Sequence, residues 1–396
     1  MSNGSGPSRV NIGFMLAPTQ QWLGGVNYYR NLFHAIGALG DARLHLTLFV
    51  GRKADENLVK QISNVQQVVK TALLDRMSLP WLAWRISRRL FGSDLFAHLW
   101  LARHRIALFS HSDMASGVAA KSINWIPDFQ HLHLPQFFSE AEREQRSGLF
   151  TWMARKSDLV VLSSETARRD FVQLVPTYAN KARVLNFVSQ PDARYWALGA
   201  ADEAALRARY DIKGAYFYLP NQFWKHKNHV TALRGFAAAR ARGLDATLIC
   251  SGAMNDYRNP EHADTIKRLI AELGLEEHVK LLGIVPYSDV YGLIRFSTAV
   301  INPSLFEGWS STVEECKSVG KRLILSDIPV HREQTSTALF FAPEDSEALA
   351  ACLQEAMTLA PQLEQAVVER DLREREHRFG AGYRDMVLSV VQGEQQ

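Results

Sequence analysis

Two acidic residues in the segment 302–315 have a spacing that suits the binding of a phosphorylated ligand. Glu307 lies in a predicted loop after a strand, and Glu315 lies in the first turns of a helix predicted to begin near Ser311. The amides at such a helix start, those of Ser311–Val313, can hold a phosphate. The two carboxylates could then bind hydroxyl groups on either side of it. The alternative is that both acids only interact favourably with the helix dipole.

A third acid, Glu314, lies in the same predicted helix. It follows Ser311 at the spacing of a capping box, in which a serine hydroxyl and a glutamate carboxylate each bind a backbone amide of the first turn. The sequence therefore predicts a structural role for Glu314.

A cationic loop, Asn221–His229, follows the predicted strand 215–219 and precedes a helix. It contains Lys225 and Lys227 together with two histidines. Ligands bind at the carboxyl ends of strands in open α/β sheets, and a lysine beside a helix N-terminus suits a phosphate. The sequence therefore predicts an anion-binding loop, with a solvated basic loop as the alternative.

A glycine pair and a polar cluster are ligand-site candidates in the first half of the chain. Gly24 and Gly25 follow the first predicted strand, where glycines let the backbone approach a ligand closely. A turn that only needs positive φ would look the same, and the dinucleotide pattern GxGxxG is absent. Asp128 and His131 follow another predicted strand and form a candidate polar site. His133 is assigned a structural role, because no cluster of further metal ligands accompanies it.

The segment Arg76–Arg105 combines basic and aromatic residues. It contains six arginines but one acid, Asp94, with tryptophans and phenylalanines between them. A basic amphipathic helix with aromatic side chains suits the surface of an anionic membrane. The alternative is an ordinary helix whose aromatic residues pack into the core.

Strands and helices alternate along the chain, and this order must position the candidate residues. Strands are predicted at 10–17, 44–50, 106–110, 123–126, 159–163 and 183–187, and then at 215–219, 246–251, 279–282, 299–301 and 323–326. Such alternation predicts parallel sheets covered by helices on both faces. The number of strands favours two sheets over one. We therefore predict two doubly wound α/β domains, at 1–190 and 191–375, with a C-terminal helix at about 376–396 packing back on the first.

The composition excludes several classes of protein. The chain has 396 residues, of which 47% are hydrophobic and 22% charged, so wholesale disorder is excluded. Three cysteines do not support a disulfide framework or a cysteine-rich zinc module. The N-terminus lacks the apolar core of a signal peptide, and we expect a cytoplasmic protein that could associate with the inner face of the cell membrane. A net charge of +4 permits anionic ligands without requiring nucleic acid.

Together these motifs resemble the retaining GT-B glycosyltransferases of family 4. The segments that carry the resemblance are VLSSETARRDF (161–171), NQFWKHKNH (221–229), LLGIVPYSDVYGLI (281–294), PSLFEGWSSTVEE (303–315) and LSDIPVHREQ (325–334). The segment PDFQHLHLPQFF (127–138) is similar to the acceptor-side segment of a subgroup that builds bacterial polysaccharides, many of them mannosyltransferases.

The resemblance implies two Rossmann-like domains that face a central cleft and a nucleoside-diphosphate sugar held mainly by the second domain, with GDP-mannose as the expected donor. It implies that Glu315 binds the ribose hydroxyls, that Glu307 binds hydroxyls of the transferred sugar, and that Lys227 contacts the diphosphate. The expected donor-binding residues are Gly24, Gly25, Asn221, Gln222, Lys225, Lys227, Gly308, Trp309, Ser310, Ser311, Thr312 and Glu315.

The catalytic residues expected from the resemblance are Glu307, Lys227, His131 and Asp128. Two positions depart from the family pattern. Gln222 stands where a basic residue is common, so Lys225 could take its role. Pro127 stands where a histidine is common, and His131 could substitute for it.

The resulting hypothesis is a metal-independent hexosyltransferase without a cofactor. It would transfer a sugar to a saccharide or lipid-linked saccharide in the synthesis of a bacterial surface polysaccharide such as lipopolysaccharide. The alternatives are another enzyme on the same fold, such as an epimerase or a phosphorylase, and a non-catalytic or repurposed sugar-nucleotide-binding protein.

Overall fold

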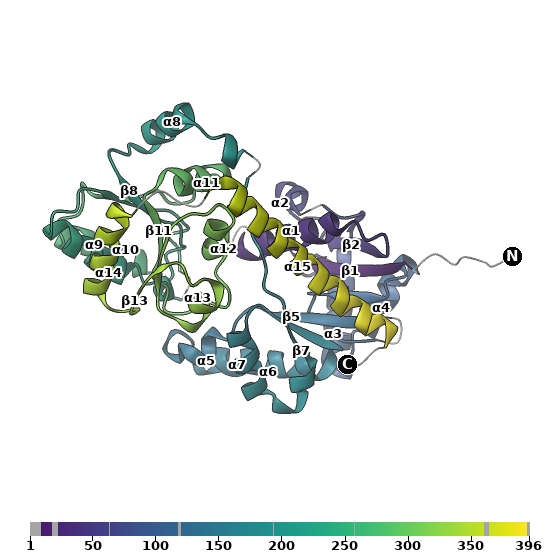
Figure 1. The fold of residues 1–396 in the computed structure, drawn as a ribbon. Helices are drawn as coiled ribbons and strands as arrows, with labels where there is room; N and C mark the ends of the chain where they lie inside the picture. The colour runs from purple at the N-terminus through teal and green to yellow at the C-terminus, as the bar shows by residue number, and fades with distance from the viewer. Residues whose placement is uncertain are drawn as a thin grey trace. The chain divides into compact units, whose positions relative to one another are not determined.

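The computed structural model describes residues 9–17, 23–62, 64–117, 120–192, 194–256, 258–359 and 364–393. The chain divides into two compact units. Unit 1 comprises Met1–Phe129, Ser139–Val188 and Glu374–Gln396, and unit 2 comprises Gln130–Phe138 and Ser189–Arg373. Each unit is described by itself (Figure 1).

Unit 1 is built on a seven-stranded parallel sheet with the strand order β3-β2-β1-β4-β5-β6-β7. Its strands are β1 (Val10–Leu16), β2 (Leu44–Val50), β3 (Gln67–Lys70), β4 (Leu108–Ser110), β5 (Lys121–Ile126), β6 (Leu159–Leu162) and β7 (Ala182–Val184). Its helices are α1 (Leu23–Leu39), α2 (Glu56–Gln61), α3 (Leu79–Phe91), α4 (Leu95–Leu101), α6 (Glu140–Lys156), α7 (Glu165–Leu174) and the later part of α15 (Gln365–Gln392).

Unit 2 is built on a six-stranded parallel sheet with the strand order β10-β9-β8-β11-β12-β13. Its strands are β8 (Tyr216–Leu219), β9 (Thr247–Cys250), β10 (Val279–Leu281), β11 (Ala299–Asn302), β12 (Leu323–Ser326) and β13 (Leu339–Phe341). Its helices are α5 (Gln130–His133), α8 (Ala200–Tyr210), α9 (His229–Ala241), α10 (His262–Glu272), α11 (Tyr287–Phe296), α12 (Ser311–Lys317), α13 (Pro329–Gln334) and α14 (Ser346–Thr358).

Strand β8 shows why the sheet of unit 2 is covered on both faces. Its four residues are all fully buried. Because successive side chains of a strand point to opposite faces, Phe217 and Leu219 join one apolar cluster, whereas Tyr216 and Tyr218 join another. A parallel sheet buried on both faces is the arrangement that the alternating pattern predicts, so the predicted fold class is confirmed.

The two strands that sequence reasoning missed are both edge strands. β3 and β13 each lie at one end of their sheet; β3 is mostly exposed and β13 is partly buried. β3 contains only two apolar residues, and the apolar run of β13 is three residues long, so both fall short of the four to eight residues by which a strand is recognised. The segment Arg76–Arg105, for which the sequence indicates helical structure, contains two α-helices, because Gly92 adopts a left-handed conformation (φ 59°) that ends α3.

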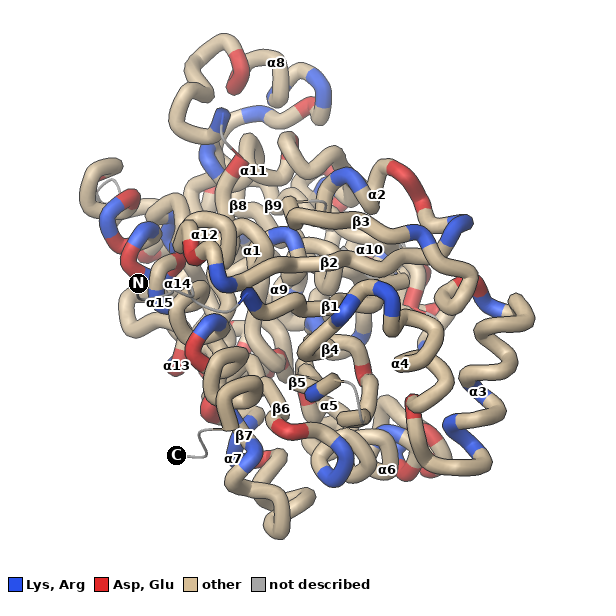
Figure 2. The backbone as a smooth tube through the Cα atoms, turned by 90° about the vertical axis from the view of Figure 1, so that its right-hand side faces the viewer, with Lys and Arg blue, Asp and Glu red and all other residues tan. Residues whose placement is uncertain are grey.

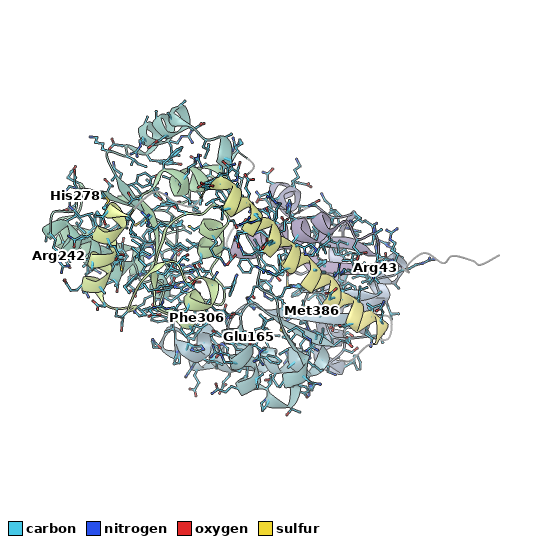
Figure 3. The ribbon with its side chains drawn as sticks, in the orientation of Figure 1. Arg43, Glu165, Arg242, His278, Phe306 and Met386 are labelled. Carbon is cyan, nitrogen blue, oxygen red and sulfur yellow. The ribbon has the colours of Figure 1, made fainter. Side chains whose placement is uncertain are left out.

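Helix α15 packs against α1 in unit 1. The Nε2 atom of His34 on α1 lies 2.9 Å from Oε1 of Glu376, and Met386, labelled in Figure 3, is buried further along α15. The two helices are in close contact at Gly380, where an added Cβ would lie 2.6 Å from the carbonyl oxygen of Ala35. Of the helices in the described part of the chain, none has the length and apolar character needed to cross a membrane.

The close contact at Gly380 generates a stability prediction. Gly380→Ala should destabilise unit 1 by about 1–3 kcal/mol, because the backbone of α1 cannot move away from the new methyl group without repacking. Urea unfolding followed by circular dichroism measures this. The matched control is Gly148→Ala in α6, where nothing lies within 4 Å of the added Cβ and alanine should stabilise the helix by about 0.5–1 kcal/mol. Equal effects of the two substitutions would contradict the proposed packing.

Candidate functional site

The loops after β8 and β11 are tied together where the strand order of the unit 2 sheet reverses. These two strands are neighbours in the sheet although β9 and β10 lie between them in the sequence. Asn221 Nδ2 donates to Asn302 Oδ1 (2.9 Å), and Asn302 Nδ2 donates to Ser310 Oγ (2.8 Å). Thr312 Oγ1 donates to Asn221 Oδ1 (3.2 Å). Ligands bind at such a reversal in open α/β sheets, so both predicted loops lie where this fold places a ligand.

Lys227 and Glu307 form a buried ion pair at this reversal. Lys227 Nζ lies 2.6 Å from Glu307 Oε1, and the two side chains are 18% and 9% exposed. Ser304 Oγ donates to the same carboxylate oxygen at 2.7 Å. Asn228, with a φ of 56°, turns the chain from the short 3₁₀ helix that carries Lys227 into α9. The loop geometry thus brings together the two residues that the sequence singled out on separate motifs.

The environment of Glu307 keeps its carboxyl group ionised. Burial by itself would raise the pKa of Glu307, but the positive charge of Lys227 opposes it, as do the field of His331 and the hydrogen bonds from Lys227 and Ser304. Together they lower the pKa to about 2. At neutral pH this side chain therefore accepts hydrogen bonds and has no proton to donate.

His331 is a further buried group near Glu307 that sequence reasoning did not select. It lies on α13, which follows β12, the strand beside β11. Its Nδ1 donates to the carbonyl oxygen of Ser326 (2.8 Å), and among the described residues its Nε2 has no hydrogen-bond partner. Burial lowers the pKa of His331. The sequence feature that could have identified His331 is its place in LSDIPVHREQ, directly after a strand that adjoins the site.

The start of helix α12 differs from the predicted capping box by one residue. The N-cap is Ser310, whose Oγ accepts a hydrogen bond from the Val313 amide (3.3 Å). The capping-box pairing of Ser311 with Glu314 is therefore wrong. Glu314 instead accepts hydrogen bonds from Gln334 Nε2 (3.1 Å) and Lys317 Nζ (2.9 Å). By sequence, either of the two adjacent serines fits the N-cap position. The buried side chain of Gln334 favours Ser310, because it forms hydrogen bonds with both the backbone amide and the backbone carbonyl of Ser310 (3.0 Å each).

The other candidates of unit 2 differ in their accessibility. Glu315 is buried and accepts a hydrogen bond from the Tyr287 hydroxyl (3.3 Å). Asn221, Ser310 and Thr312 are also buried, and their side chains join the two loops. The side chains with at least partial exposure are those of Gln222, Lys225, Trp309 and Ser311, together with the backbone of Gly308.

The candidates of unit 1 lie apart from these two loops in the sequence. Gly24 and Gly25 are in the first turn of α1 and not in a turn before it, so the interpretation as a positive-φ turn is wrong. An added Cβ at Gly24 would meet nothing within 4 Å. Asp128 accepts a hydrogen bond from Arg146 Nη2 (3.1 Å). His131, on α5, belongs to unit 2 and is buried.

A residue with positive φ, His111, follows β4 at the strand-order reversal of the unit 1 sheet. His111 has a φ of 55° and its ring is buried between polar partners. Its Nε2 lies 2.8 Å from the Tyr28 hydroxyl and its Nδ1 lies 2.7 Å from Ser110 Oγ, while Tyr29 donates to its carbonyl oxygen (2.7 Å). Burial lowers the pKa of His111 to about 3, so the ring is neutral at physiological pH.

Among the described residues, no group of three or more His, Cys, Asp or Glu side chains could hold a metal ion.

Comparisons with known proteins show which family and which structures this chain is similar to. Residues 205–370 match the family described as Glycosyl transferases group 1. A curated relative, the O-antigen chain mannosyltransferase RfbU of Salmonella typhimurium, is 28% identical over 137 residues. That match covers 34% of this chain and 36% of the length of RfbU.

Solved structures share the fold over nearly the whole chain. Anabaena HepE in complex with UDP and glucose has a TM-score of 0.65 at 16% identity and covers 97% of this chain and 98% of its own. A glycosyltransferase from Rickettsia africae has a TM-score of 0.66 at 14% identity, covering 98% and 99%. Sucrose-phosphate synthase from Thermosynechococcus elongatus has a TM-score of 0.67 at 16% identity, covering 97% and 99%. The predicted GT-B fold is confirmed.

The ion pair generates a prediction about stability. Lys227→Met should destabilise unit 2 by about 3–5 kcal/mol at pH 7, because it leaves the Glu307 carboxylate buried without its cation. The double variant Lys227→Met/Glu307→Gln should be more stable than Lys227→Met alone, since the buried charge is then removed. Urea unfolding of the single and double variants measures this coupling. As a control, Lys267→Met, which breaks an exposed pair with Asp264, should change stability little. Additive effects at positions 227 and 307 would refute the pairing.

The lowered pKa of Glu307 generates a prediction about pH. Its pKa is about 2 in the folded protein against an ordinary value of 4.5. A carboxyl group of this kind stabilises the fold above its unfolded pKa and loses that contribution as the pH falls towards the folded pKa. The difference in unfolding free energy between wild type and Glu307→Gln should therefore be constant above about pH 5 and decrease between about pH 4.5 and 2. Denaturant titrations at several pH values measure it, and a difference that does not change with pH would contradict the assignment.

Proposed function

We propose a reaction for this chain from the premise that it is a glycosyltransferase, whose residues 205–370 form a glycosyl transferases group 1 domain within a GT-B fold. It transfers a hexose from a nucleoside-diphosphate sugar to a saccharide or lipid-linked saccharide, with retention of the anomeric configuration. The observation that carries this proposal is the buried Lys227–Glu307 pair between the two loops at the strand-order reversal of unit 2.

Lys227 is proposed to bind the donor diphosphate. Glycosyl transfer passes through an oxocarbenium-like transition state, in which negative charge grows on the leaving diphosphate while positive charge grows on the sugar. An ammonium group can donate three hydrogen bonds, so Lys227 can contact phosphate oxygens while it keeps its bond to Glu307. Because this cation is already held in a largely buried position, it stabilises the leaving group without reorganisation.

Glu307 is proposed to orient the transferred sugar. With a pKa of about 2 it is a carboxylate throughout the physiological range, so it accepts hydrogen bonds from sugar hydroxyls and cannot protonate the leaving group. Its negative charge also favours the positive charge that develops on the sugar ring. Ser304 and Lys227 hold one carboxylate oxygen, Oε1, which fixes the direction in which the carboxylate points.

The remaining donor contacts are proposed from the same loops. Glu315, positioned by Tyr287, binds the ribose hydroxyls. Gln222 stands where a basic residue is common in similar proteins, and exposed Lys225 supplies the positive charge instead. We propose that these cations make a metal ion and a cofactor unnecessary. Asp128 and His131 are proposed to act on the acceptor, and Gly24 and Gly25 to approach the diphosphate.

The donor and the pathway are supported by the names of similar proteins. The relative RfbU is named as an O-antigen chain mannosyltransferase, which supports GDP-mannose and a role in the synthesis of a lipopolysaccharide-type surface polysaccharide. HepE is described in complex with UDP and with UDP-glucose, which makes a UDP-sugar the donor to test beside it. We propose that the enzyme works in the cytoplasm at the inner face of the membrane, where lipid-linked acceptors are found.

The proposed reaction is tested with a panel of GDP-, UDP-, dTDP- and ADP-sugars and a mixture of lipid-linked acceptors, read by mass spectrometry. Wild type should form a glycosylated product with one donor class. Glu307→Gln should reduce kcat by about 10²–10³-fold with that donor, because it removes a charge that acts in the transition state. Folding of each variant is checked by circular dichroism. Lys267→Met, which changes an exposed residue of α10, serves as the active control.

Two outcomes would count against this function. Wild-type kcat in Glu307→Gln would refute the site assignment. A thermal shift with a nucleotide sugar, but no transfer to any acceptor in the mixture, would favour a sugar-nucleotide-binding protein without catalysis.

A further inference from the structure

Helices α3 and α4 of unit 1 lie near each other (Figure 2). Their exposed apolar side chains are here called the α3–α4 surface. Each of its main members is between 46% and 83% exposed: Leu79, Ile86, Leu90, Phe91, Leu95 and Leu99. Single exposed apolar side chains are common on proteins, but a group of this size on one pair of helices marks an interaction surface.

The apolar side chains of α3 fall on two opposite faces. Ile86 and Leu90 follow Leu79 by seven and eleven residues, so the three side chains share one face of the helix. This face is exposed. The opposite face is part of the core. There Trp84 is 6% exposed and donates from Nε1 to Asp94 (2.7 Å), and Arg88 stacks on the Trp152 ring of α6 at 4.0 Å.

The exposed charged side chains of residues 76–105 are all positive. Of the six arginines between Arg76 and Arg105, only Arg88 is held inside, where its Nη2 donates to the carbonyl oxygen of Asp113 (2.6 Å). The single acid of the segment, Asp94, is buried and accepts from the amide of Ala115 (2.6 Å). The five exposed arginines are Arg76, Arg85, Arg89, Arg103 and Arg105.

We propose that the α3–α4 surface docks the protein on an anionic lipid bilayer. The exposed apolar face of α3 enters the boundary between headgroups and acyl chains, and Arg85 and Arg89 on its flank bind lipid phosphates. A second copy of this chain is a poorer occupant, because its own arginines would face these across the interface. A bilayer offers negative charge all along the exposed face of α3, which matches the exposed Arg85 and Arg89 on this helix.

The proposal is independent of the proposed reaction, since binding to a lipid surface requires neither donor nor acceptor. It is tested by sedimentation of the full chain with vesicles of phosphatidylcholine alone or mixed with phosphatidylglycerol. Wild type should bind the mixed vesicles, bind phosphatidylcholine vesicles far less, and lose binding as salt is raised. Arg85→Glu/Arg89→Glu should weaken binding by more than about tenfold, as each arginine near an anionic surface contributes to the attraction. Leu90→Ser/Phe91→Ser should weaken it without removing charge.

Matched controls separate the surface from total charge. Arg155→Glu/Arg169→Glu changes the net charge of the chain by the same amount on exposed residues of α6 and α7, and it should bind as wild type does. Arg88 is left unchanged because it holds the core. Equal binding by Arg85→Glu/Arg89→Glu and wild type, or no binding to mixed vesicles at low salt, would overturn the proposal. A dimer of wild type that Leu90→Ser/Phe91→Ser abolishes, without vesicle binding, would assign the surface to self-association instead.

Discussion

The ion pair between Lys227 and Glu307 is the interaction on which the site of unit 2 depends. Two charges largely removed from water cost several kcal/mol each in lost hydration, and only close pairing with further hydrogen bonds offsets this. The 2.6 Å contact provides the pairing, and Ser304 provides a further hydrogen bond. Such a pair adds little net stability compared with apolar side chains of the same size. The pair holds a cation at the strand-order reversal of the sheet, the place where ligands bind in open α/β sheets.

The rest of the site holds the two loops so that this pair can form. The amides of Asn221 and Asn302 link the ends of β8 and β11, and Ser310 extends the link to the start of α12. Gln334 joins the first turn of α12 to α13 through the backbone of Ser310. Burial would raise the pKa of Glu307, but the charges of Lys227 and His331 and the hydrogen bonds from Lys227 and Ser304 lower it to about 2.

Most of the architecture, and part of the site, could be predicted from the sequence. Continuous apolar runs identify the central strands, and the parallel order then places Lys227 and Glu307 at the carboxyl ends of two of them. That these strands are neighbours was not readable, because strand order depends on long-range packing. His331 and Gln334 were missed because a buried polar residue has no periodic signature. The cap of α12 was misplaced because Ser310 and Ser311 satisfy the same local rule, and a side chain on another helix selects between them.

Helix α3 shows a different limit of sequence reasoning. A helix face that packs into the core and a helix face that binds a partner are both apolar. The periodicity of residues 79–91 therefore cannot distinguish between them. The structure contains both: Trp84 and Arg88 face inwards, whereas Leu79, Ile86 and Leu90 are exposed. The charges divide in the same way, since Arg88 interacts with Asp113 and Arg85 and Arg89 remain at the surface. The modest net charge of +4 is therefore a poor guide to binding, because the burial of Asp94 leaves five exposed arginines without an exposed acid in their own segment.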